Sequence, residues 1–205
     1  MSAYYFSSRI WVAMLNAVGA QSGIAITGDS LNYTINPDAP VSANKMAVYR
    51  TTIGIMYAPD SPQGTSAPSS EQRIAHLVFT NSPNSGNYDA IIKTLNFNLS
   101  QVGIHNTASR TLKVYLDNVG PTPHFQTAFS GDFQDTTISE SAFPQFVVSA
   151  GTTRNVYVTL DTTDASINSR LTFSVGANDV VWSDGITPSE KFVRELPLSS
   201  RSFNY

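Results

Sequence analysis

Apolar and polar residues alternate strictly in the last third of the chain, and this period of two is what most constrains the fold. Val156, Val158 and Leu160 are separated by single residues of another kind, the pattern returns at residues 171–175, and a further apolar segment follows at 180–182. Successive side chains of a β-strand point to opposite faces, so this spacing places one set in a core and the other in solvent. The sequence therefore predicts an all-β fold, an Ig-like antiparallel β-sandwich.

Further strand candidates precede this region. They lie at residues 46–57, 73–80, 91–100, 111–117 and 125–129. In residues 91–100, strict alternation predicts that Ile91 and Lys93 share a face with Leu95, while Asn96 and Asn98 lie on the opposite face. The predicted core is Leu77, Phe79, Leu95, Phe97, Leu112, Val114, Val156, Val158, Leu171, Phe173, Val175 and Trp182. We expect a sandwich domain at residues 46–205, with an N-terminal arm and accessory strands at residues 1–45.

The polar surface is built from uncharged side chains. Only 13% of the 205 residues are charged, against roughly 25% in average globular proteins, whereas Ser, Thr and Asn number 26, 20 and 15. The net charge is −3 and no basic cluster occurs, so the sequence predicts no nucleic-acid partner. Abundant hydroxyl and amide groups favour an extracellular, cell-surface location.

The sequence contains no motif or residue spacing typical of a catalytic, cofactor or metal site. Cysteine is absent, which excludes disulfides, thiolate metal sites and a cysteine nucleophile. His76, His105 and His124 lack metal-ligand spacing, and His76 is expected to be a hydrogen-bonded strand residue. Asp117, residues 132–135 and residues 161–164 carry the oxygen ligands that calcium prefers, but we expect turns there. The protein is therefore predicted not to be an enzyme. No run of about 20 apolar residues predicts a membrane-spanning helix.

The order of several short segments resembles Ser/Thr-rich β-sandwich modules in predicted surface proteins of uncultivated, small-genome bacteria. The segments are MAVYRTT (46–52), AHLVF (75–79), IIKTLNF (91–97), SAGTTRNVYV (149–158), LDTT (160–163) and VWSDG (181–185). Thr52 stands where those modules often have proline, and residues 1–45 lie outside the resemblance. It implies an extracellular, non-enzymatic structural role, with no catalytic residues to carry over.

An apolar run precedes the sandwich. It includes Ile10, Trp11, Val12, Met14, Leu15 and Val18, which we predict to form a subunit interface. Spacing does not decide whether the run is a helix or a strand. A short apolar run followed by small residues also fits a secretory signal sequence, but we expect an ordered, retained arm. An ordered apolar arm needs a surface to cover it, which is either a neighbouring copy, by strand addition, or its own domain.

These observations predict a structural subunit that self-associates into a filament, sheath or array, with copies of itself as partners. An alternative is a polysaccharide-binding or adhesive module with exposed aromatic rings. Candidate rings are Tyr4, Tyr5, Phe6, Trp11, Tyr33, Tyr88 and Tyr205. A viral capsid or tail protein is a further alternative, because such proteins share this composition.

Overall fold

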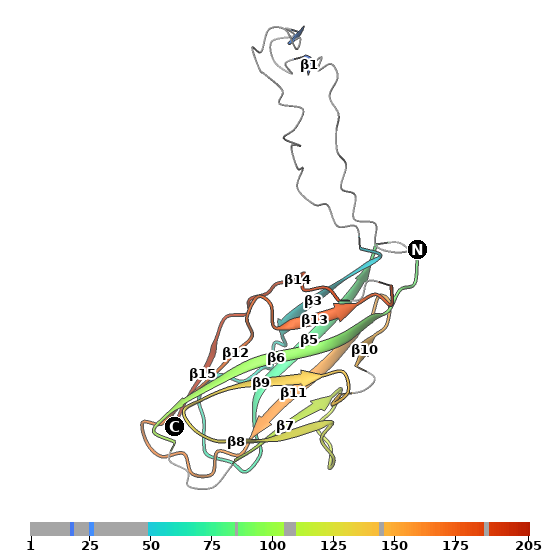
Figure 1. Cartoon of the computed structure of the whole chain (residues 1–205). Helices are drawn as coiled ribbons and strands as arrows, with labels where there is room; N and C mark the ends of the chain where they lie inside the picture. The colour runs from blue at the N-terminus through green and yellow to red at the C-terminus, as the bar shows by residue number, and fades with distance from the viewer. Residues whose placement is uncertain are drawn as a thin grey trace, which may run out of the picture. The chain divides into compact units, whose positions relative to one another are not determined.

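Figure 1 shows the fold, a computed structural model. The described residues are 49–84, 86–104, 110–143, 146–186 and 189–205, with the backbone of 17–18 and 25–26. The chain divides after Val48 into two units. In the first unit, β1 (Ala17–Val18) pairs antiparallel with β2 (Ala25–Ile26). All the remaining strands lie in the second unit, and no helix occurs among its described residues. No helix in the described part of the chain is long and apolar enough to cross a membrane.

Six strands form the first sheet of the second unit. In spatial order they are β14 (Val193–Arg194), β3 (Thr51–Tyr57), β5 (Gln72–Pro83), β11 (Thr153–Leu160), β7 (Arg110–Leu116) and β8 (Phe125–Phe129). Neighbours run antiparallel except β14, which is parallel to β3. The sheet therefore ends on a two-residue strand at one side and on the five-residue strand β8 at the other.

The second sheet is organised around the long strand β6 (Ala90–Val102). One side of β6 pairs with β9 (Phe133–Ser139) and β10 (Val147–Val148), and the other with β12 (Arg170–Ser174) and β13 (Val180–Ser183). Beyond β12 lie β15 (Arg201–Asn204) and β4 (Gly64–Thr65), which pair in parallel. This sheet also ends on a two-residue strand at one side, while the seven-residue β9 bounds the other.

The two sheets enclose one apolar core, and alternation along the strands determines which residues enter it. Every residue of the predicted core is buried. Phe173 of the second sheet meets Phe97 with ring centroids 5.3 Å apart, and it meets Tyr57 of the first sheet at 6.4 Å. Phe79 contacts Phe146 edge-on at 4.9 Å. Such contacts between aromatic rings add to the free energy of burial.

The all-β class and the two-layer sandwich are confirmed, while the Ig-like topology stays a prediction. The sheets are mixed rather than purely antiparallel, because the two short strands β14 and β4 run parallel to their neighbours. The candidate strand at 125–129 is confirmed as β8.

The prediction for the start of β6 is wrong in its face assignment. Ile92 is buried and Ile91 is not, although Leu95 is buried as predicted. Two residues, Lys93 and Thr94, therefore separate these buried positions instead of one. The cause is a β-bulge: Val181 pairs with Thr94 but the next residue, Trp182, pairs with Ile92. An extra residue in one strand reverses the alternation beyond it, which a strict period of two does not anticipate.

Candidate functional site

A polar pocket lies on the outer face of the second sheet. It is lined by Asn96 and Asn98 of β6, Asp135 and Thr137 of β9, and Asp179, with a volume of about 250 Å³. Cross-strand pairing creates it, because Asn96 is opposite Thr137 and Asn98 is opposite Asp135. Alternation turns these four side chains away from the core, since the intervening Phe97 is fully buried.

Asp179 closes the pocket on the side of β6 where β12 and β13 pair with different parts of that strand. On this side β12 pairs with β6 as far as Asn98, and β13 begins its pairing at Leu95. The connecting turn is fixed by Asp179, whose carboxylate accepts a hydrogen bond from the Gly176 N–H. The Asp179 carbonyl accepts the Asn96 N–H at 2.6 Å. The turn therefore places a carboxylate beside the two asparagine side chains.

The side chains around this polar pocket are mostly not used by the fold. Within the described residues, those of Asn98, Asp135 and Thr137 form no hydrogen bond, and Oδ1 of Asn96 is buried without a partner. Neither Asp135 nor Asp179 forms an ion pair with a described residue. The pocket thus offers amide, hydroxyl and carboxylate groups, both donors and acceptors, with a negative charge.

An exposed aromatic ring lies on the same face of the sheet. Phe133 pairs with Ser100, so it occupies the outer face two residues from Asp135, and 60% of it is exposed. Val102, also exposed, occupies the same face at the end of β6. Phe133 was not among the aromatic rings predicted to be exposed, and residues 132–135 were predicted to form a turn. That assignment is wrong for Asp135, which lies within β9. The alternation of Phe133, Asp135 and Thr137 was the available signal.

The two sheets have open edges on the same side of the sandwich. β8 and β9 are each the last strand of their sheet, and the Gln134 amide of β9 donates to the Ala128 carbonyl of β8 at 3.2 Å. Among the twelve residues of the two strands only Asp135 is charged. Unpaired edges are templates for another strand, and proteins usually protect them with lysine, proline or bulges.

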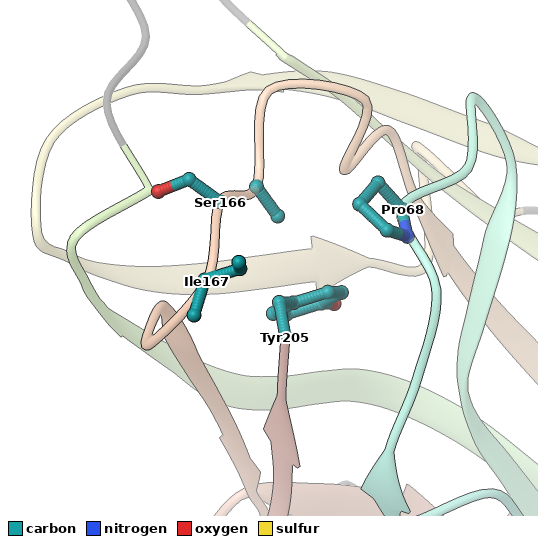
Figure 2. A pocket seen from close by; sticks show the side chains of 5 residues that line it. Pro68, Ser166, Ile167 and Tyr205 are labelled. Atoms are coloured by element: carbon teal, nitrogen blue, oxygen red, sulfur yellow. The ribbon is translucent and has the colours of Figure 1, made fainter.

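A second pocket, mainly apolar, lies near the C-terminal residue of the chain (Figure 2). Pro68, Ala165, Ser166, Ile167 and Tyr205 line its volume of about 480 Å³. The Tyr205 hydroxyl donates to Oε1 of Gln72 at 2.6 Å, and burial raises the pKa of this tyrosine. Ile167 is almost fully exposed. This pocket therefore offers a mainly apolar surface suited to an apolar side chain.

The histidines described by the structure have structural roles. His76 of β5 is buried and stacks on Tyr157 with ring centroids 4.2 Å apart. Its Nδ1 contacts the Asp60 carboxylate and its Nε2 lies 3.0 Å from Oδ1 of Asn155. The expectation of a hydrogen-bonded strand residue is confirmed. Nδ1 of His124 accepts the Leu116 N–H at 3.2 Å, and His105 lies outside the described residues.

Two of the aspartate segments have the local roles expected of turns. Oδ1 of Asp161 accepts hydrogen bonds from the N–H and the hydroxyl of Thr163. Asp117 has a positive φ of 62° and forms an ion pair with Arg154 at 2.7 Å. Among the described residues, no three His, Cys, Asp or Glu side chains gather closely enough to hold a metal ion.

The structure does not test the predicted subunit interface. Ile10, Trp11, Val12, Met14 and Leu15 lie outside the described residues, and Val18 is described only by its backbone in β1. Of the aromatic candidates, Tyr88 lies beneath the Arg50 guanidinium, 3.8 Å from the ring centroid, and Tyr205 lines the apolar pocket. The other five rings lie outside the described residues.

No protein-family model matches the chain, and the comparison with curated proteins finds no match.

Proposed function

We propose that the protein is a non-enzymatic structural subunit of an extracellular surface assembly, a filament, sheath or array. The observation that carries this proposal is the pair of open edges formed by β8 and β9. On the opposite side, each sheet ends on a strand of only two residues. Short edge strands limit the pairing of further chains, whereas β8 and β9 offer edges of five and seven residues to a second copy.

The sparse charge of this side favours association. β8 carries no charged residue and β9 only Asp135, so two such edges approach with little electrostatic repulsion. The exposed residues of β8, Gln126 and Ala128, are uncharged and small enough to lie alongside a neighbouring strand. Backbone hydrogen bonds then supply affinity, as in other strand-addition interfaces.

The apolar pocket supports a second contact, made by the N-terminal arm. Residues 1–48 join the domain at Tyr49, whose carbonyl accepts the Asn84 amide just beyond the Pro83 end of β5. The pocket adjoins the other end of β5, because Tyr205 contacts Gln72. An arm leaving one end and entering a pocket at the other end of a neighbour gives an open, head-to-tail polymer.

The proposal is tested by placing charge on the open edge. We expect the double variant Gln126→Lys/Ala128→Lys to raise the concentration needed for assembly at least tenfold, measured by sedimentation velocity. A matched control is Ser199→Lys/Ser200→Lys, which adds the same charge at two exposed positions outside both edges. If the edge variant assembles at the same concentration as wild type, the edges do not form the interface.

A further inference from the structure

We propose that the polar pocket and Phe133 together form a binding site for a neutral saccharide. This inference concerns the outer face of the second sheet, whereas the proposed assembly uses the edges of the sheets. The two proposals therefore stand or fall separately.

The chemistry of the pocket matches that of vicinal hydroxyl groups. Each sugar hydroxyl is both a donor and an acceptor, so its partners need to offer both functions. Asn96 and Asn98 offer a donor and an acceptor in one planar amide, and Asp135 adds two acceptors. All three lie on neighbouring strands of a sheet, which holds their backbones in fixed positions.

Several of these groups have no hydrogen-bond partner among the described residues. Oδ1 of Asn96 is buried without such a partner, whereas buried polar atoms are normally paired. The side chains of Asn98 and Asp135 likewise have no hydrogen-bond partner within the described residues. Binding a polyhydroxylated ligand would therefore break no side-chain hydrogen bond of Asn98 or Asp135.

Phe133 supplies the apolar part of the site. Its side chain lies on the same face as Asp135, and residues two apart along a strand are separated by roughly 7 Å. A pyranose ring has one face of C–H groups, which stacks on an aromatic ring while its hydroxyls reach polar neighbours. An exposed phenylalanine beside a polar pocket is suited to this combination.

Charge selects neutral sugars. Asp135 and Asp179 both line the pocket, and neither carboxylate has an ion-pair partner among the described residues. Their negative potential repels uronates and sulfated sugars. A divalent cation would also use carboxylate oxygens, but it leaves the exposed ring of Phe133 without a role, so we favour the saccharide.

The test is calorimetric titration of the full chain with neutral gluco-, xylo- and manno-oligosaccharides, with oligogalacturonate as the anionic comparison. We expect millimolar or tighter binding of at least one neutral probe and none of the anionic one. Phe133→Ala and Asn98→Ala should each weaken binding at least tenfold. The matched control is Phe192→Ala, which removes another ring that is 54% exposed but lies outside this face, and it should bind as wild type does.

Several outcomes would overturn the site. They are no heat with any neutral probe at millimolar concentration, equal binding by wild type and both site variants, or heat with calcium chloride but not with saccharide. Far-UV spectra and melting temperatures confirm that each variant is folded. Binding should persist in the edge variant Gln126→Lys/Ala128→Lys, so a failure of the assembly proposal leaves the saccharide result interpretable.

Discussion

At the scale of single residues, two tyrosines differ in what their hydroxyl groups contact. The Tyr57 hydroxyl is buried with no hydrogen-bond partner among the described residues, and burial raises the pKa of this phenol to about 12. The Tyr115 hydroxyl donates to the Glu71 carboxylate. We therefore expect Tyr57→Phe to be neutral or stabilising, and Tyr115→Phe to cost about 1 kcal/mol. Urea unfolding at pH 7 measures both, and equal losses would contradict the assignment.

The same tyrosines predict an alkaline limb of stability. Burial raises the pKa of Tyr57 and Tyr115 to about 12 each, while an unfolded tyrosine titrates near 10. The unfolded chain therefore loses these protons first, and the free energy of unfolding should fall as the pH rises from about 10 to 12. The fall should be smaller in Tyr57→Phe, as measured by unfolding at several pH values.

Acid should weaken the protein through carboxylates on its surface. A hydrogen bond from Arg154 lowers the pKa of Asp117, and one from His76 lowers that of Asp60. Their stabilisation is present above the unfolded pKa of about 4 and is lost as the pH falls through the lower folded value. Asp117→Asn should flatten the loss of stability between about pH 4 and 2. An unchanged acid limb would show that this ion pair is not coupled to folding.

At the scale of elements, β6 links both halves of the second sheet and supplies much of the core. Phe97 is fully buried and contacts Phe173. Phe97→Ala should lower the free energy of unfolding by roughly 3–5 kcal/mol, seen as a sharp drop in Tm. Asn98→Ala, on the solvent face of the same strand, is the matched control and should change Tm little. Similar Tm values for both variants would contradict the face assignment.

Features that depend on neighbouring residues could be predicted from the sequence, whereas features that depend on the pairing of distant strands could not. Alternation is local, so the core faces of β6, β7, β11 and β12 were predictable, and so was the outward position of Asn96 and Asn98. The bulge at Lys93 was not, because it depends on how β13 pairs with β6. The polar pocket needs β9 and the turn at Asp179 beside β6, and this long-range pairing leaves no periodic signal.

At the scale of the whole molecule, the proposed assembly uses two contacts, one made by the N-terminal arm and one by the edges of the sandwich. Deleting residues 1–20 should leave a folded, soluble domain that no longer forms long polymers, because the arm makes the head-to-tail contact in the proposed assembly. Circular dichroism checks the fold and light scattering checks the mass. If the truncated protein still polymerises as wild type does, the arm is not donated and packs elsewhere.

Cryo-electron micrographs of the purified full chain at increasing concentration would show directly whether it assembles through its open edges. We expect regular polymers in which β8 and β9 of each copy lie against a neighbour. A monodisperse monomer at the highest concentration, or a polymer in which both edges face solvent, would contradict it.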